Sequence, residues 1–316
     1  MLRAREVGMV GPEKIGRMLD ATEFSDAAKL LIDCGYPDMS DMSLSQVDII
    51  LEKKRAEVFR EISGFKYALD ILDLFRIKYD YHNAKVLIKA AGANVDAAYL
   101  LSESGSIDAE DIANAFVSGQ RGDLPPILAA AFDSAAGILS RTGNPQLSDI
   151  EIDKAYFNEI TTIAAKLKHP FIIGYVRLLI DSANLRTIVR SARTGRDKGF
   201  LLTTLIPGWS IGIEQLTVTY EDSIPPVFPG DALTLASRLG ADAMAGGSQT
   251  AFELACDNAV LHYVTDTLFI GFGPAPVIAY LAKLEWEITV VRMILTGKYT
   301  GIPADVIRER LRECHV

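Results

Sequence analysis

The sequence predicts an all-α protein made of three similar helical units. Apolar residues recur mostly at positions i, i+3, i+4 and i+7, the spacing that places them on one face of an α-helix. Alternating valine-rich runs, which would indicate strands, do not stand out, and the one candidate, 216–220, has helical counterparts elsewhere in the chain. One pattern of charged and apolar residues also occurs three times, about a hundred residues apart.

The first part of this pattern is a basic residue, an acidic residue four positions later, then usually an asparagine, and finally a second basic residue. Its members are Arg76, Asp80, Asn83 and Lys85; Arg177, Asp181, Asn184 and Arg186; and Lys283, Glu287, Val290 and Arg292. The acidic members are 101 and 106 positions apart. The third copy departs from the pattern by having Val290 in place of asparagine.

The second part follows the first in every copy. It comprises Ser106, Ile107, Glu110, Ile112 and Phe116; Ser210, Ile211, Glu214, Leu216 and Tyr220; and Gly301, Ile302, Asp305, Ile307 and Leu311. The repeat is longer than the roughly 20 to 50 residues of ordinary solenoids and fits small domains. Breaks at 121–126 and 224–230 follow the first two copies, so we expect units at residues 1–119, 120–222 and 223–316.

The individual helices are predicted from the same apolar spacing. A charged helical pattern opens the chain, and a long amphipathic run covers 152–167. Residues 260–282 are rich in apolar side chains, but His262, Asp266 and the break at 271–276 indicate two buried core helices and not a membrane span. Pro303 suits the first turn of a last helix, where Asp305 complements the helix dipole.

The recurring charges fall on the apolar face of their helices. At about 100° per residue, Arg76, Asp80 and Asn83 lie among apolar side chains, with the neighbouring lysines opposite. The same holds for Arg177, Asp181 and Asn184, and for Lys283 and Glu287. A buried charge needs a partner, so we interpret these residues as structural ion-pair positions that fix helix register. A catalytic or proton-carrying carboxylate is the alternative, but active sites are seldom triplicated within a chain.

A basic run follows the second copy and comprises Arg186, Arg190, Arg193, Arg196 and Lys198. The simpler interpretation is a solvated face that complements a helix C-terminus. The alternative is a docking site for an acidic partner helix or loop. Asp153 and Asp257 also lie about one repeat apart, which we attribute to helix starts.

Composition sets limits on function. The chain has 316 residues, 49% hydrophobic and 23% charged, with a net charge of −9, which disfavours nucleic acid as the main partner. Its three cysteines show neither a disulfide nor a zinc pattern, and the four histidines are scattered. Gly246, Gly247 and Ser248 lack the lysine of a phosphate-binding loop. We therefore expect no metal, no cofactor and no catalytic constellation.

Four segments, 77–85, 176–186, 205–208 and 301–311, resemble the C subunit of V/A-type (vacuolar/archaeal-type) ATPases and ATP synthases, a relative of the d subunit of the eukaryotic V-ATPase. The resemblance extends from Arg3 to the C-terminus. It implies three similar helical domains in a pseudo-threefold, funnel-shaped arrangement.

The resemblance also implies a function. A protein of this kind belongs to the central stalk and is not catalytic. It links the rotating shaft of the ATP-hydrolysing head to the membrane proteolipid ring, transmitting torque for H⁺ or Na⁺ transport or for ATP synthesis. The implied partners are the shaft subunits and the ring, and the implied location is cytoplasmic, peripheral at the membrane without insertion. The alternatives are an all-α enzyme and an all-α scaffold or adaptor unrelated to ATPases.

Overall fold

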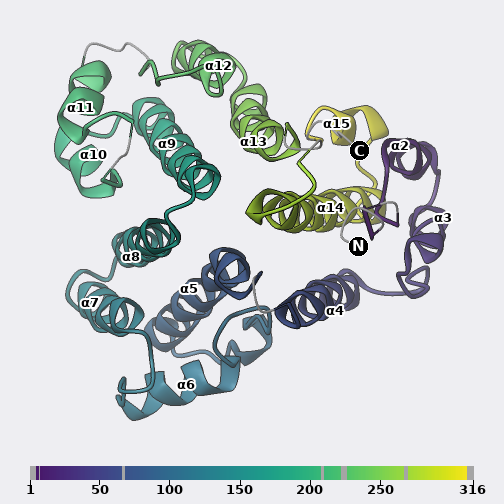
Figure 1. The fold of residues 1–316 in the computed structure, drawn as a ribbon, viewed down its shortest axis with the longest axis horizontal. Coiled ribbons are helices and arrows are strands. Elements are labelled where there is room, and N and C mark those ends of the chain that lie inside the picture. The colour runs from purple at the N-terminus through teal and green to yellow at the C-terminus, as the bar shows by residue number, and fades with distance from the viewer. Residues whose placement is uncertain are drawn as a thin grey trace. The chain divides into compact units, whose positions relative to one another are not determined.

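The computed structural model describes residues 5–6, 8–65, 68–207, 210–221, 226–266 and 270–311. Within these ranges the regular elements are all helices, which confirms the all-α prediction (Figure 1). The α-helices are α2 (Pro12–Asp20), α3 (Phe24–Lys29), α4 (Leu44–Ser63), α5 (Leu69–Ala93), α6 (Ala109–Ser118), α7 (Pro126–Thr142), α8 (Pro145–Leu167), α9 (Pro170–Arg193), α10 (Lys198–Thr204), α11 (Ile213–Glu221), α12 (Thr234–Met244), α13 (Gln249–Thr265), α14 (Pro274–Tyr299) and α15 (Ala304–Arg308). Two short 3₁₀ helices are η1 (Ile32–Cys34) and η3 (Ala98–Leu100).

Several helices begin at residues that stabilise a helix N-terminus. The side chains of Asp108, Asn144, Asp197 and Ser248 each accept a hydrogen bond from a backbone N–H in the first turn of α6, α8, α10 and α13. Proline occupies the first turn of α2, α7, α8 and α14, where its missing N–H removes no helical hydrogen bond.

The chain falls into two compact units. The continuous unit comprises residues 59–176, and the discontinuous unit comprises residues 1–58 together with 177–316. The three-unit division at 119 and 222 stays a prediction, and position 222 lies outside the described residues. The funnel-shaped arrangement also stays a prediction.

In the continuous unit, α5 packs against α7 and α8, which form an antiparallel pair through the short turn at Gly143 (Figure 1). Phe132, Ile152 and Ile160 are fully buried between these helices. Phe75 and Tyr175 stack with ring centroids 5.9 Å apart. Burying large apolar side chains is the main favourable term in holding such helices together.

The discontinuous unit brings the two ends of the chain together. Both α3, near the start of the chain, and α15, near its end, pack against α14, and α2 contacts α15 (Figure 1). Lys298 donates to the backbone carbonyls of Leu19, at 2.6 Å, and Ala21, at 2.5 Å. The N-terminal segment is therefore part of the same core as the last long helix.

Two sequence expectations about single segments are settled here. The candidate strand 216–220 lies within the helix α11, in agreement with the all-α assignment. The apolar stretch 260–282 divides between α13 and α14, with irregular backbone at 270–273. Among the described residues, no helix has the length and apolar content to cross a membrane.

Candidate functional site

The first copy of the repeated pattern attaches α5 to the loop that precedes α6. Asn83 Nδ2 donates to the carbonyl of Ser102 at 2.9 Å, and the Ser102 N–H donates to Asn83 Oδ1 at 2.7 Å. Asp80 accepts from the hydroxyl and the N–H of Ser106, and from the N–H of Ile107 at 3.1 Å. The carboxylate and the amide together bind backbone groups of a partly buried loop, an arrangement that we call a helix latch.

Arg76 completes the first latch from one turn earlier on α5. Its Nε donates to the carbonyl of Gly105 at 2.8 Å. A Cβ atom on Gly105 would lie 2.2 Å from Asp80 Oδ1, so only glycine allows this backbone to approach the carboxylate so closely. Arg76 is half-buried, whereas Asp80 and Asn83 are buried.

The second copy forms the same latch between α9 and the loop before α11. Asn184 accepts from the N–H of Ile206 and donates to its carbonyl, both at 2.9 Å. The Ser210 hydroxyl donates to Asp181. In both copies the residue paired with asparagine precedes the serine on the carboxylate by four positions.

The sequence predicts that Arg177 is part of a buried ion pair, but its side chain is exposed. Its charge still lowers the pKa of Asp181, but the contribution is smaller than that of the hydrogen bonds from Ser210. The helical position alone could not reveal this, since it predicts a face and not the depth to which a long side chain is covered.

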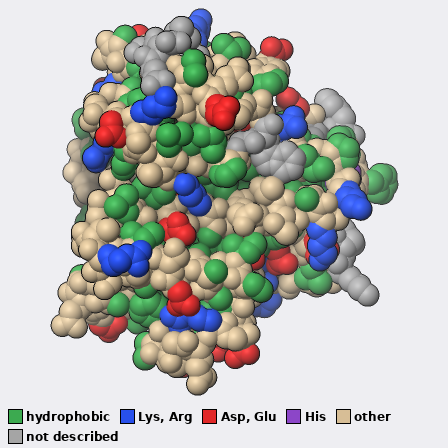
Figure 2. All heavy atoms as spheres, turned by 90° about the vertical axis from the view of Figure 1, so that its left-hand side faces the viewer, with side chains coloured by type: hydrophobic (Ala, Val, Ile, Leu, Met, Phe, Trp, Pro, Cys, Tyr) green, Lys and Arg blue, Asp and Glu red, His purple; other side chains and the backbone are tan. Residues whose placement is uncertain are grey.

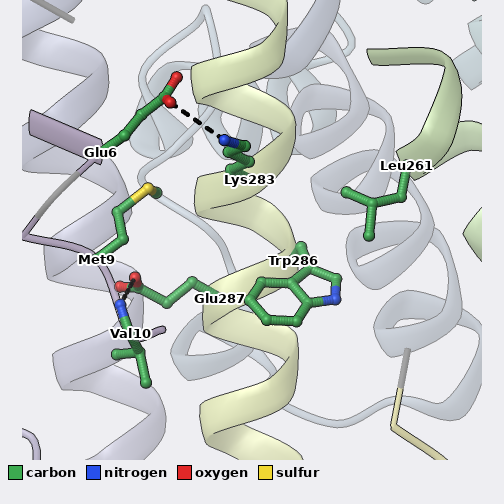
Figure 3. A pocket seen from close by; sticks show the side chains of 7 residues that line it. All are labelled: Glu6, Met9, Val10, Leu261, Lys283, Trp286 and Glu287. Atoms are coloured by element: carbon green, nitrogen blue, oxygen red, sulfur yellow. Dashed lines mark hydrogen bonds and ion pairs between the residues drawn. The ribbon is translucent and has the colours of Figure 1, made fainter. Parts of the chain in front are cut away.

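The third copy uses a different partner. Glu287 on α14 accepts from the N–H of Val10 at 2.7 Å, and Lys283 donates to Glu6 at 3.1 Å (Figure 3). Glu287 also accepts from the Tyr36 hydroxyl at 2.6 Å. Gly301 stands where the other copies have serine, so this position has no hydroxyl to donate. The carboxylate of the third copy therefore binds the beginning of the chain.

Burial dominates the electrostatics of all three carboxylates. It raises the pKa of Asp80 to about 6, although hydrogen bonds from Ser106 and Ile107 and the charge of Arg76 lower it. Burial also raises the pKa of Asp181, against the hydrogen bonds from Ser210. It raises the pKa of Glu287 too, against the donors Tyr36 and Val10. Each carboxylate is engaged by donors of its own chain.

The last basic member of each copy forms an ion pair with an aspartate on another helix. Lys85 lies 2.5 Å from Asp153 on α8, Arg186 lies 2.6 Å from Asp257 on α13, and Arg292 lies 2.7 Å from Asp48 on α4. The attribution of Asp153 and Asp257 to helix starts is wrong, because α8 begins at Pro145 and α13 at Gln249.

Asp48 was missed by sequence reasoning, although a signal existed. The three aspartates are 105 and 104 positions apart, which matches the repeat. Asp48 precedes the first copy of the pattern, however, and its partner Arg292 belongs to the last copy. A search for partners within one unit could not connect them.

The basic run is largely engaged within the chain. Arg186 also pairs with Glu253 at 2.8 Å, and Arg190 pairs with Glu253 at 2.7 Å. Arg193 donates to the carbonyl of Ala243 at 2.7 Å and to that of Gly247 at 3.1 Å. These contacts attach α9 to α13, to the last turn of α12 and to the turn between those two helices.

The last two members of the run, Arg196 and Lys198, are exposed, and the Arg196 guanidinium lies 4.7 Å from the Phe200 ring centroid. On the face drawn in Figure 2, Lys and Arg side chains lie scattered among Asp and Glu. Docking of an acidic partner on the basic run stays a prediction.

A small pocket lies beside the third copy. It is lined by Glu6, Met9, Val10, Leu261, Lys283, Trp286 and Glu287 (Figure 3). Trp286 is buried, and its indole Nε1 has no hydrogen-bond partner among the described residues. In the part of the chain that the structure describes, no cluster of His, Cys, Asp and Glu is arranged to hold a metal ion. The geometry of these sites is that of helix attachment.

Comparison with known proteins gives matches along the whole chain. The C subunit of the V-type sodium ATPase of Enterococcus hirae is 21% identical, and the match covers 100% of this chain and 97% of the relative. The C subunit of the V-type ATP synthase of Thermus thermophilus is 22% identical, covering 91% and 89%. The C subunit of the A-type ATP synthase of Thermococcus kodakarensis is 22% identical, covering 99% and 88%.

The match to the family is equally extensive. Residues 1–310 match the ATP synthase (C/AC39) subunit family, a range that contains the first two copies of the repeated pattern and the third except for its last member, Leu311. The chain belongs to the ATP synthase (C/AC39) subunit family, and the relatives named above are C subunits of a V-type sodium ATPase and of V-type and A-type ATP synthases.

Proposed function

We propose that the protein is a non-catalytic central-stalk subunit of a V/A-type rotary ATPase. In this role it links the rotating shaft of the ATP-hydrolysing head to the membrane proteolipid ring. It transmits the torque that couples ATP hydrolysis or synthesis to the movement of H⁺ or Na⁺. It lies on the cytoplasmic side, peripheral at the membrane. The observation that carries this proposal is the family match over residues 1–310.

The polar contacts of the structure are compatible with a mechanical role. A part that transmits torque must resist deformation, and buried polar pairs fix the register between helices. The latches at Asp80 and Asp181 attach long helices to the loops that follow them. The pairs Lys85–Asp153 and Arg186–Asp257 attach the same helices to further helices. These side chains are used internally, which leaves the exposed surface to contact partners.

The transported ion is not fixed by the family. One relative is named as part of a sodium ATPase, and the others are named as parts of ATP synthases. Because the proposed role is mechanical, the same protein can serve a complex that transports either ion. The experiment therefore measures the transport of both ions.

The decisive experiment removes this protein from cells that carry the complex. ATP hydrolysis by the head and ATP-driven ion uptake into membrane vesicles are then measured, for H⁺ and for Na⁺ separately. We expect hydrolysis to persist and uptake to disappear, and adding back the purified chain to restore uptake. Normal uptake without the protein would rule out the connector role, and loss of head ATPase activity would indicate a catalytic contribution.

A further inference from the structure

The third copy of the repeat has a shorter connection between its two parts than the other copies have. The second part begins 21 positions after Lys85 and 24 positions after Arg186, but only nine positions after Arg292. In the first two copies this connection contains the residues that bind the asparagine side chain, Ser102 and Ile206. The third connection is therefore too short to form a latch loop of this kind.

The start of the chain supplies the donors that this connection lacks. In the first two copies the buried carboxylate accepts from a serine that follows the connection. In the third copy Glu287 accepts from the Val10 N–H at 2.7 Å and from the Tyr36 hydroxyl at 2.6 Å. One turn earlier on α14, Lys283 donates to Glu6 at 3.1 Å. The N-terminal segment therefore takes over the role of the latch loop.

Each long helix is also joined to a second helix by two ion pairs, and the three arrangements share one register. The pairs are Lys85–Asp153 and Lys89–Asp149 between α5 and α8, Arg186–Asp257 and Arg190–Glu253 between α9 and α13, and Arg292–Asp48 and Glu285–Arg55 between α14 and α4. In each set the residue number rises on one helix by as much as it falls on the other, as antiparallel helices require. The step is four residues in the first two sets and seven in the third, about one and two helical turns.

The three partner helices correspond to one another, because Asp48, Asp153 and Asp257 are 105 and 104 positions apart. In the first two copies the partner helix comes later in the chain than the long helix, whereas α4 precedes α14. A unit that begins with a long helix and ends with the next partner helix is therefore contiguous in two copies and divided between the chain ends in the third. The compact unit at residues 59–176, which contains α5 and α8, agrees with this order.

One ion pair distinguishes α4 from the other partner helices. The Arg55 side chain lies 3.2 Å from Glu285, and Arg55 is only 6% exposed. Arg55 follows the shared aspartate by seven positions, where α8 has the buried Ile160 and α13 the buried Val264. An apolar pair would be about as stable, so the buried charges are best explained by the helix pairing that they specify. Specification matters here because 230 positions separate Arg55 from Glu285.

We propose that the N-terminal segment, described at residues 5–6 and 8–58, is a strap that closes the third unit of a cyclically permuted repeat, and that the ion pair Arg55–Glu285 directs it to α14. The far end of the strap is bound as well, because Arg308 pairs with Asp20 at 3.2 Å and Lys298 donates to the carbonyl of Leu19. No short connection joins the strap to α14, so it detaches before the other units open. This inference does not depend on the proposed function.

Circular permutation tests the order of the units. The C-terminus is joined to the N-terminus by a flexible Gly/Ser linker, and the full chain is opened in one of two short exposed turns. Opening between Lys168 and His169 leaves every long helix followed by its partner helix. Opening between Gly143 and Asn144 separates α8 from α5 in the chain and is the matched control.

The two permutants are compared with the wild type by circular dichroism melts and amide hydrogen exchange. We expect the permutant opened at Lys168 to melt cooperatively, with exchange rates in α5, α9 and α14 within about threefold of the wild type. In the control we expect exchange in α5 and α8 to be at least ~10-fold faster. If the two permutants behave alike, or if the first is the less protected one, the cyclic order is wrong.

Arg55→Met tests the ion pair in the uncut chain. We expect exchange in α2, α3 and α4 to become at least ~10-fold faster, while α5 and α8 keep their rates. Lys85→Met, which removes the ion pair to Asp153, is the matched control and should leave α2 to α4 unchanged. Glu285→Gln keeps the side-chain shape and removes the charge, so it should give the Arg55→Met pattern at smaller size.

The same substitution in the permutant separates a strap from an ordinary buried ion pair. In the permutant opened at Lys168 the linker holds the strap beside α14, so Arg55→Met should accelerate exchange in α2 to α4 by a smaller factor than in the uncut chain. Equal factors in both chains would overturn the strap. Unchanged exchange in α2 to α4 with both Arg55→Met and Glu285→Gln would overturn the role of the ion pair.

Discussion

Asn83 and Ser102 exchange two hydrogen bonds, one in each direction, at 2.9 and 2.7 Å. Asn184 and Ile206 do the same in the second copy, with both distances at 2.9 Å. An amide side chain is suited to this arrangement because it carries both a donor and an acceptor. The asparagine side chain thus binds the N–H and the carbonyl of one residue, as the backbone of a neighbouring strand would. Both members of each pair are buried.

The first prediction concerns this pair. Asn184→Ala leaves the N–H and the carbonyl of Ile206 buried without partners, so we expect the free energy of unfolding to fall by about 2 to 4 kcal/mol. Denaturant titration followed by circular dichroism measures the change. A loss below about 0.5 kcal/mol would mean that water replaces the amide at no cost and that the latch is not structural.

The third copy supplies a control in which introducing an asparagine, and not removing one, should destabilise the fold. Val290 occupies the position of the asparagine, is 1% exposed, and lacks the loop that an amide would bind. Val290→Asn therefore buries a polar group without a partner, and we expect it to destabilise by about 1 to 3 kcal/mol. The same side chain would then stabilise two copies and destabilise the third. A neutral effect would show that the third copy retains a partner for asparagine.

The sequence predicted part of this arrangement and not the rest, for identifiable reasons. Helical periodicity placed Asp80, Asp181 and Glu287 on apolar faces, and all three are buried. Periodicity contains no information on which segment covers that face. The partners of Glu287 are Val10, 277 positions away in the chain, and Tyr36, 251 positions away, and no local pattern connects them to it.

Periodicity was also insufficient for Arg177, the arginine that precedes the second carboxylate. The spacing of Arg177 and Asp181 suggests an ion pair, but Ser210 donates directly to the carboxylate and Arg177 is exposed. The serine is visible in the repeated pattern, and its regular position before a helix is the available signal. For Asp181, the hydrogen bonds from Ser210 lower the pKa of the carboxylate more than the charge of Arg177 does, so the recurring serine was the stronger signal.

The second prediction concerns pH. The pKa of Asp80 is about 6 in the folded chain against an ordinary 3.8, so the folded state holds this proton more tightly than the unfolded state. The resulting stabilisation is complete below about pH 4 and is lost as the pH rises through 6. Two pKa units correspond to about 3 kcal/mol, so we expect a gain of roughly 2 to 3 kcal/mol between pH 7 and pH 4 from this residue.

Asp80→Asn isolates that contribution. As the pH falls from 7 to 4, the unfolding free energy of the wild type should rise relative to that of the variant by roughly 2 to 3 kcal/mol. The reason is that residue 80 titrates only in the wild type. The raised pKa values of Asp181 and Glu287 act in the same direction, and the lowered pKa of Glu253 acts in the opposite direction, in both proteins. Parallel pH profiles for the two proteins would contradict the assignment.

The third prediction concerns the ion pairs between helices. The side chains of Arg186 and Asp257 are 21% and 31% exposed, whereas those of Arg292 and Asp48 are 49% and 52% exposed. Solvent screens the second pair more strongly, so a double-mutant cycle should give a coupling of about 1 kcal/mol for the first pair and less than about 0.5 kcal/mol for the second. Equal couplings in high salt and low salt would show that the interaction is not electrostatic.

The fourth prediction concerns the contacts between the start of the chain and the last long helix, α14. Removing residues 1–10 deprives Glu287 of the Val10 N–H and Lys283 of Glu6, leaving two buried charges with fewer partners. We expect amide hydrogen exchange to accelerate in α14, which belongs to the discontinuous unit, and to remain unchanged in α5, which belongs to the continuous unit.

Two single substitutions sharpen this test. Tyr36→Phe removes only one donor to Glu287 and should produce a smaller acceleration in α14 than the truncation does, because the Val10 N–H remains bound. Tyr81→Phe, which removes a tyrosine–carboxylate contact with Glu159 in the continuous unit, is the matched control and should leave α14 unaffected. If amide hydrogen exchange in α14 is unchanged after truncation, the N-terminal contacts do not stabilise this helix.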